Sequence, residues 1–333
     1  MTLVSARSRL AIAVGVATLP LFTIRHAAAA PQFSFRLNHS MTTADAVQTA
    51  MLALADGVKK HSDGRIEVTI FPNDGLGSQT DVNEMVRQGA SIINATDPLF
   101  LGQYVADASV LQAPYLMDKP DDFVKLIGTP WLNDITTRLA VKGVRVISWN
   151  NYFGTRQILS KKPIRKPADL ADMNFRCAAA PMYVETVKAM GGRPVVTDFA
   201  SVYTGLAQGT VDLLEAPLPT IWASKYYEQA KYVCLTNHMI GWLPVTMSEA
   251  VYSKMPADLQ KCLADAAADA AEMMSRLKRQ QEQEILPKYQ AAGCTVIQDV
   301  DRDAFRRVTA PIYDRYPGFT PSIKTTVQAL LAK

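Results

Sequence analysis

The sequence has few of the residues that metal-binding and many catalytic proteins use. Its 333 residues include four cysteines and four histidines, and none has the Cys-x-x-Cys or Cys/His spacing of a zinc or redox site. It also has no Gly-x-Ser-x-Gly and no His-Glu-x-x-His segment, which mark serine hydrolases and zinc proteases. We therefore expect no metal and no cofactor.

The net charge of the chain is also small. The chain carries a net +4, and three of its arginines (Arg7, Arg9 and Arg25) lie in residues 1–30, which hold no acidic residue. Without them the net charge is about +1, and no stripe of Lys and Arg remains to neutralise phosphates. We expect no nucleic-acid partner.

The longest apolar run is too short to span a membrane. It extends from Leu10 to Ile24 and is interrupted by Pro20, whereas a transmembrane helix needs about 20 apolar residues. A basic start, a short apolar stretch and the small residues Ala27–Ala30 form a secretory signal peptide. We predict cleavage near Ala29 or Ala30 and a periplasmic mature protein.

Export makes disulfides possible, and Cys177, Cys234, Cys262 and Cys294 allow three full pairings. Cys262 and Cys294 flank a long predicted helix and, at about 1.5 Å per residue, lie too far apart to bond. We expect single buried thiols.

Two stretches of the chain alternate strand-like and helix-like patterns. In the first, strands are predicted at 33–38, 65–71 and 91–95, and helices at 43–60 and 79–88. In the second, strands are predicted at 144–149, 156–160, 174–178, 195–197 and 211–214, and helices at 181–191 and 201–208. This alternation predicts parallel sheets with helices on both faces, and therefore two α/β domains with a cleft between them.

A long helix is predicted at 256–292, where apolar residues recur mostly every three or four positions. Short helices are expected in the tail, residues 299–333. We assign residues 1–30 to the signal peptide. The first domain is residues 31–152 plus about 242–282, and the second is residues 153–241 plus about 283–333.

Arg176 ends a predicted strand, and a helix begins a few residues later. In wound α/β sheets ligands bind at the carboxyl ends of strands, and a guanidinium group can hold a carboxylate with two hydrogen bonds. Arg156 lies on a neighbouring strand of the same unit. From spacing alone, surface or structural ion pairs are the more common role of such arginines.

Three segments carry a resemblance to a known family. They are GRIEVTIFPNDGLGSQTDVNEMVRQGA, GTRQILSKKPIRKPADLADMNFRCAAAPMYVETVKAMGGRPVV and FASVYTGLAQGTVDLLEAPLPTIWASKYYEQAKYV. In their order and spacing they resemble the solute-binding proteins of tripartite ATP-independent periplasmic (TRAP) transporters, of the dicarboxylate-binding type. The resemblance covers about residues 33–300.

The resemblance implies a two-domain periplasmic-binding-protein fold, with a ligand cleft between the domains and a long helix spanning both. It implies a monomer, not an enzyme, that closes around a small organic acid such as a C4-dicarboxylate-like carboxylate and delivers it to membrane subunits. Arg176 would be the main carboxylate contact, Arg156 would assist it, and Phe199 would pack on the ligand. The remaining implied site residues are Asn38, His39, Asp97, Trp149 and Glu215.

The chain departs from the family pattern at Ala216, where an Asn usually lies between Glu and Pro, and at Leu213 and Ser201. Ala216 removes a polar group beside the arginine, so the resemblance implies a bulkier or less hydroxylated acid than a short dicarboxylate.

Two other functions stay open from the sequence. One is an exported hydrolase of small organic acids that uses Glu215 or Asp212 as a base. The other is a periplasmic partner of a sensor kinase that binds the same class of ligand.

Overall fold

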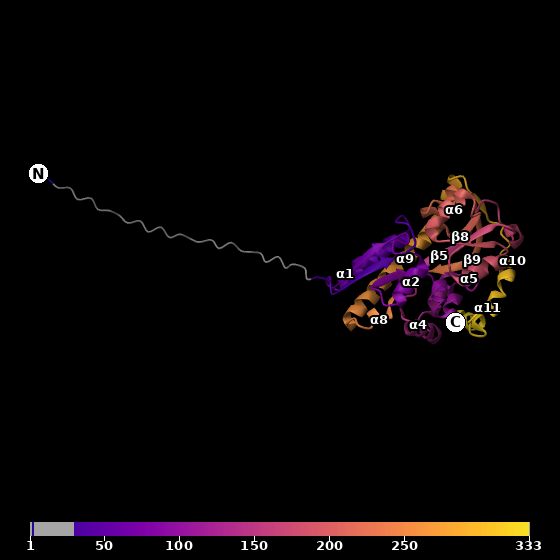
Figure 1. The fold of residues 1–333 in the computed structure, drawn as a ribbon. Helices are drawn as coiled ribbons and strands as arrows, with labels where there is room; N and C mark the ends of the chain where they lie inside the picture. Colours follow the sequence, from indigo (N-terminus) through magenta and orange to yellow (C-terminus); the bar gives the residue numbers. More distant parts are fainter. Residues whose placement is uncertain (1, 3–29, 333) are drawn as a thin grey trace. The chain divides into compact units, whose positions relative to one another are not determined.

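Two β-sheets organise the part of the chain that the computed structural model describes, which is residue 2 and residues 30–332 (Figure 1). The predicted signal peptide therefore lies almost wholly outside the described residues. The first sheet has the strand order β2-β1-β3-β10-β4 and the second the order β11-β9-β5-β8-β6-β7. The first sheet consists of β1 (Phe33–Asn38), β2 (Ile66–Phe71), β3 (Ile92–Ala95), β4 (Val144–Ser148) and β10 (Val245–Ser248). The second consists of β5 (Tyr152–Ser160), β6 (Asn174–Cys177), β7 (Arg193–Val196), β8 (Leu213–Pro217), β9 (Tyr232–Trp242) and β11 (Thr295–Ile297).

Helices cover both sheets. The α-helices are α1 (Ala46–His61), α2 (Gln79–Arg87), α3 (Pro98–Leu101), α4 (Pro130–Val141), α5 (Pro181–Met190), α6 (Val202–Gln208), α7 (Leu218–Ala223), α8 (Glu249–Tyr252), α9 (Ala257–Ala291), α10 (Arg302–Thr309), α11 (Ile312–Arg315) and α12 (Ile323–Leu331). Short 3-10 helices are η1 (Ala106–Gln112), η2 (Pro120–Leu126), η3 (Pro167–Leu170), η4 (Phe199–Ser201) and η5 (Tyr226–Glu228).

Both sheets are mixed, whereas the sequence predicted parallel sheets. Strand β1 pairs in parallel with β2 and β3, and β6 pairs in parallel with β7 and β8. However, β10 runs antiparallel to β3 and β4, and β5 runs antiparallel to β8 and β9. The chain passes from the first sheet to the second between β4 and β5, and it returns between β9 and β10. At these crossings β4 lies beside β10 and β5 lies beside β9, and because the chain leaves along one strand and returns along the other, each pair is antiparallel.

Two hydrophobic cores lie between the sheets and the helices that cover them. One contains apolar side chains of α1, α7 and α9, and the other contains those of α4, α5 and α10. Each sheet is thus buried on both faces, as expected for strands that alternate with helices.

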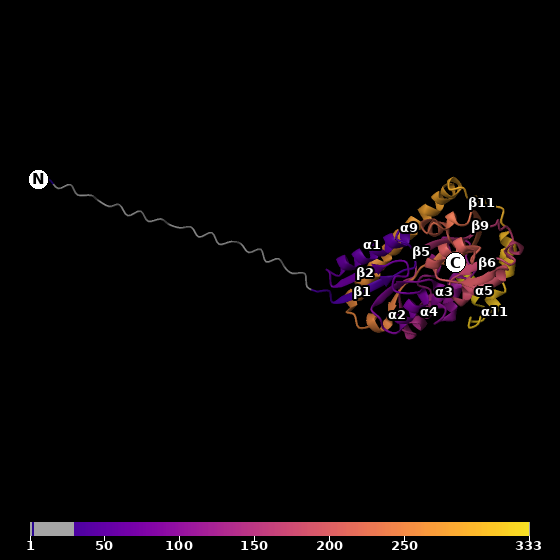
Figure 2. The same ribbon diagram turned by 45° about the horizontal axis from the view of Figure 1, so that its top comes forward.

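Helix α9 is 35 residues long, packs against α1, α7, β4 and β5, and so connects the two sheets (Figure 2). The buried ammonium group of Lys278 in α9 donates to Asp45 Oδ1 at 2.6 Å and to Thr220 Oγ1 at 2.8 Å. Asp45 caps the start of α1 and Thr220 lies in α7. The Lys278 ammonium group therefore joins α1, which follows β1 of the first sheet, to α7, which follows β8 of the second.

The four cysteines are free thiols; Cys177, Cys234 and Cys294 are buried, whereas Cys262 is partly exposed. In residues 30–332, none of the helices combines the length and the apolar character required to cross a bilayer.

We predict that Lys278→Ala destabilises the fold by about 3–5 kcal/mol, because it leaves the buried Asp45 carboxylate without its cation. Urea unfolding at neutral pH measures this. The control is Lys261→Ala on the same helix, whose solvent-exposed pair with Asp265 should contribute much less to stability. Equal losses in the two variants would show that the buried pair is not structurally important.

Candidate functional site

A cavity lies where the carboxyl ends of strands from both sheets face each other. From the first sheet come residues that follow β1, β2 and β3, and from the second come residues at the ends of β6, β7 and β8. The lining residues are Ser40, Met41, Asp74, Gln79, Thr80, Ala95, Asp97, Phe100, Phe153, Arg156, Arg176, Ala178, Ala179, Tyr183, Thr197, Asp198, Phe199, Ala216 and Leu243. The cavity volume is about 70 Å³, several times the roughly 10–15 Å³ needed for one water molecule.

Arg176 is buried at the end of β6 with a relative exposure of 3%. Its Nε and Nη2 donate to the carbonyl oxygen of Thr197 at 2.9 and 2.7 Å, and its guanidinium carbon lies 5.4 Å from the centre of the Phe199 ring. No carboxylate of residues 30–332 forms an ion pair with it within 4.0 Å. Burial lowers the pKa of Arg176, but a guanidinium group stays positively charged in proteins.

Arg156, on β5, is buried and fully paired. Its Nη2 donates to Glu215 Oε1 at 2.8 Å, its Nε donates to Glu215 Oε2, and its Nη1 lies 3.7 Å from Asp97 Oδ2. Burial alone would lower the pKa of Arg156, but the charge of Glu215 raises it. The two arginines therefore differ: Arg156 is neutralised inside the protein and Arg176 is not.

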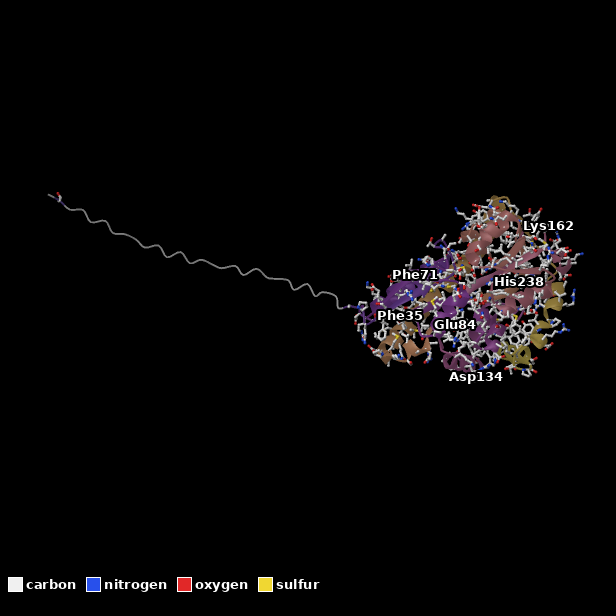
Figure 3. All side chains as sticks on the ribbon, in the orientation of Figure 1. Phe35, Phe71, Glu84, Asp134, Lys162 and His238 are labelled. Atoms are coloured by element: carbon white, nitrogen blue, oxygen red, sulfur yellow. The ribbon has the colours of Figure 1, made fainter. Side chains whose placement is uncertain are left out.

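Glu215, on β8, faces Arg156 and not the cavity. Burial would raise its pKa, but the charge and hydrogen bonds of Arg156 lower the pKa of Glu215 to about 2. His238, a buried residue of β9 labelled in Figure 3, has its Nε2 3.4 Å from Glu215 Oε2. Glu215 thus lies between the side chains of Arg156 on β5 and His238 on β9.

Asp97 connects the two sides of the cleft. It caps α3 by accepting from the Leu99 amide at 2.9 Å, and its other oxygen accepts from Gln112 Nε2 at 2.7 Å and from the Tyr183 hydroxyl at 2.6 Å. Asp97 follows β3 of the first sheet, whereas Tyr183 lies in α5 beside the second. Burial raises the pKa of Asp97, and the nearby charge of Arg156 partly offsets this.

Four of the eight predicted site residues line the cavity, namely Arg156, Arg176, Phe199 and Asp97. Asn38 and His39 lie behind it. Asn38 accepts from the Leu76 amide at 3.2 Å, and His39 pairs with Gln48 at 2.8 Å and accepts from the Met41 amide at 3.2 Å. They fix the loop that brings its neighbours Ser40 and Met41 to the cavity.

Trp149 and Glu215 are not cavity-lining residues either. The Trp149 indole donates to Thr136 Oγ1 of α4 at 2.9 Å, so this side chain packs against a helix of the first sheet. Ala216 does line the cavity, so the departure from the family pattern changes its wall directly.

Several cavity residues were not predicted from the sequence, among them Ser40, Asp74, Gln79, Thr80 and Tyr183. The Pro-Asn-Asp-Gly turn and the start of α2 were visible as patterns, and three of these residues lie there. The pattern alone does not indicate where their side chains point. Tyr183 has no local signal, because its role depends on Asp97, 86 positions away.

Comparison with known proteins identifies the family. Residues 37–317 match the model of the bacterial extracellular solute-binding protein family 7, known as DctP. The 2,3-diketo-L-gulonate-binding periplasmic protein YiaO of Escherichia coli K12 is 28% identical over 274 residues, covering 82% of this chain and 83% of that protein.

Solved structures agree with the sequence relatives. A TRAP periplasmic solute-binding protein from Actinobacillus succinogenes 130Z with bound L-galactonate is 32% identical, with a TM-score of 0.87 over 90% of this chain and 99% of that chain. One from Ochrobacterium anthropi with bound L-fuconate is 30% identical, with a TM-score of 0.86 over 90% and 99% of the chains. The predicted two-domain fold with a ligand cleft is confirmed.

These relatives are periplasmic binding proteins and not enzymes, which favours the transport function over the exported hydrolase. The chain belongs to the bacterial extracellular solute-binding protein family 7, the solute-binding proteins of TRAP transporters.

Proposed function

We propose that the cavity between the two sheets binds a small organic acid, with the guanidinium group of Arg176 as the main contact for its carboxylate. The observation that supports this most directly is the contrast between the two buried arginines. Arg156 has Glu215 and Asp97 as partners, whereas Arg176 has only the Thr197 carbonyl. A buried charge without a counter-ion is costly, and a carboxylate in the cavity would supply one through charge-assisted hydrogen bonds.

The ring of Phe199 would pack against the solute beside the carboxylate, since it lines the cavity next to Arg176. Binding would favour the closed arrangement because only there do both sides of the cleft touch the solute. Relatives bind acids such as L-galactonate and L-fuconate, which supports an acid ligand here.

The protein would then deliver the acid to the membrane subunits of a TRAP transporter. We further propose that residues 1–30 direct export to the periplasm and are removed, that the mature protein is a monomer, and that its domains follow the boundaries predicted above. The intact mass of the protein recovered from the periplasm and its elution in size-exclusion chromatography test these points.

We predict that Arg176→Ala weakens the binding of organic acids at least tenfold, because one charge-assisted contact contributes about 1.5–3 kcal/mol. Arg176→Lys should not restore the affinity, since an ammonium group cannot form the two-pronged contact. Titration calorimetry against L-galactonate and other acids found in a thermal-shift screen measures this.

The control for this series is Arg193→Ala, which removes an exposed guanidinium group from the neighbouring strand β7. It should bind acids as the wild type does. Near-native affinity in Arg176→Ala would refute the proposed contact.

We predict that Glu215 stabilises the fold in a pH-dependent way. Its pKa is lowered to about 2, so its contribution, on the order of 3 kcal/mol, is complete above its unfolded pKa of about 4.5 and is lost as the pH falls toward 2. Urea unfolding of wild type and Glu215→Gln should differ most at neutral pH, and the difference should shrink below pH 4.5. The control is Glu185→Gln, which changes a half-exposed side chain paired with Lys188. A wild-type advantage over Glu215→Gln that is independent of pH would contradict the pairing.

A further inference from the structure

Strand β9 departs from regular pairing at a point close to the cavity. The two neighbours of Gln157 in β5 pair with Met239 and Cys234 of β9. Residues 235–238 of β9 therefore lie opposite Gln157 alone, as a large bulge. A bulge can re-aim a side chain, and bulges are over-represented next to active sites.

The bulge decides which way His238 points. If the regular pairing continued beyond Met239, His238 would lie opposite Gln157 and on the same face of the sheet. It would then point away from Arg156 and Glu215, because successive side chains of a strand point to opposite faces. Instead, His238 is buried with its Nε2 3.4 Å from Glu215 Oε2. The contact between these two residues therefore depends on the bulge.

Two residues of the bulge are held by side chains of β5 and α10. The Asn237 amide donates to Gln157 Oε1 at 2.9 Å, and Arg302 Nε donates to the Leu235 carbonyl at 2.9 Å. Asn237 has a φ of +46°, in the left-handed region that residues other than glycine seldom adopt. Such a conformation persists only where the surrounding contacts impose it, so these hydrogen bonds help to maintain the bulge.

Tyr115 holds the other two residues of the bulge. Its hydroxyl group donates to the Thr236 carbonyl at 3.1 Å, and its amide donates to the His238 carbonyl at 2.8 Å. The Thr236 hydroxyl oxygen in turn lies 2.7 Å from His238 Nδ1. Tyr115 has a φ of +55°, which is unusual for a bulky residue. It lies between η1 and η2, in the chain between β3 and β4 of the first sheet, so it fixes a strand of the second sheet from the first.

Tyr115, Gln157 and Arg302 are here called the bulge-holding residues, and none of them lines the cavity. They line a separate groove of about 380 Å³ beside α9 and α10. Arg156 and Gln157 are neighbours in β5, so their side chains point to opposite faces of the sheet, one to the cavity and one to the groove. Any effect of the bulge-holding residues on a solute must therefore pass through β5 and β9.

We propose that the bulge-holding residues position the solute site, because they turn His238 toward Glu215 and thereby fix Arg156 at the cavity wall. Glu215 accepts hydrogen bonds from two nitrogens of Arg156, so a shift of Glu215 moves a guanidinium group that lines the cavity. A binding site keeps its geometry only when the side chains behind it are fixed by packing and hydrogen bonds. This inference rests on the proposed function, because the affinity for an acid is one of its two readouts.

A double-mutant cycle in the mature protein tests the inference. Gln157→Leu removes the acceptor of the Asn237 amide with little change in volume, and His238→Leu removes the imidazole. We expect each variant to weaken the binding of L-galactonate about three- to tenfold in titration calorimetry, the range for one hydrogen bond. The double variant should bind within about twofold of His238→Leu, because Gln157 acts through His238. Tyr115→Phe, which removes only the hydroxyl group, should weaken binding in the same direction.

A spectroscopic readout separates positioning from general destabilisation. Residues 31–333 contain three histidines, namely His39, His61 and His238. The imidazole NMR resonances of His238 are therefore assigned by their loss in His238→Leu, and we expect Gln157→Leu to shift them in the protein without acid. The control is Arg145→Ala, which removes a partly exposed ion pair with Glu249 on the first sheet. It should lower the melting temperature and change neither the His238 resonances nor the affinity.

Thermal melting establishes that each variant is folded, and two independent positions keep the test decisive if one variant fails to fold. Unchanged His238 resonances in both Gln157→Leu and Tyr115→Phe would overturn the inference, as would effects of Gln157→Leu and His238→Leu that multiply in the double variant. In either case, loss of binding in Arg176→Ala would still support the proposed function. If the wild type binds no acid of the thermal-shift screen, the inference falls together with the proposed function.

Discussion

A guanidinium group keeps its positive charge inside a protein, so each buried arginine requires negative charge or carbonyl oxygens around it. The cleft of this protein holds two such groups within one cavity wall. Glu215 and Asp97 surround Arg156, and only the carbonyl of Thr197 supports Arg176. The first arginine thus belongs to the framework, and the second is oriented by that framework toward the cavity. Pre-orientation of this kind would reduce the cost of the proposed carboxylate contact, because the guanidinium group is already fixed.

The same framework brings the two sheets together. The hydrogen bond from Tyr183 to Asp97 crosses the cleft beside the arginines, and the contacts of Lys278 with Asp45 and Thr220 do so along α9. In the proposed mechanism such contacts would stabilise a closed arrangement in part, and a solute that touches both sides would add to them. A ligand shifts an equilibrium between open and closed forms only by the difference between its affinities for the two. In the proposed mechanism, contacts from both sheets would therefore make closure depend on the solute.

The local patterns in the sequence predicted much of the fold. The strands and helices of residues 33–95 and 174–208 lie within a few residues of their predicted positions, because alternation and turn residues determine them locally. Strands β9 and β10 were missed. Both are almost continuously buried, and β9 includes the polar residues Asn237 and His238, so neither shows the alternation that marks a strand. Their antiparallel pairing depends on residues far away in the chain.

The site was predictable only in part, for a related reason. Arg176 lies at the end of a strand, where wound α/β sheets usually bind ligands. Phe199 was predicted from the family resemblance. Whether an arginine is paired depends on distant partners: Arg156 meets Glu215, 59 positions later, and Asp97, 59 positions earlier.

The most direct test of this account is a crystal structure of the protein with an acid that it binds in solution. The account predicts that the carboxylate lies in the cavity between the sheets, with its oxygens about 2.7–2.9 Å from the nitrogens of the Arg176 guanidinium group. A solute bound elsewhere, or one whose carboxylate faces Arg156 while Arg176 makes no contact with it, would contradict the account.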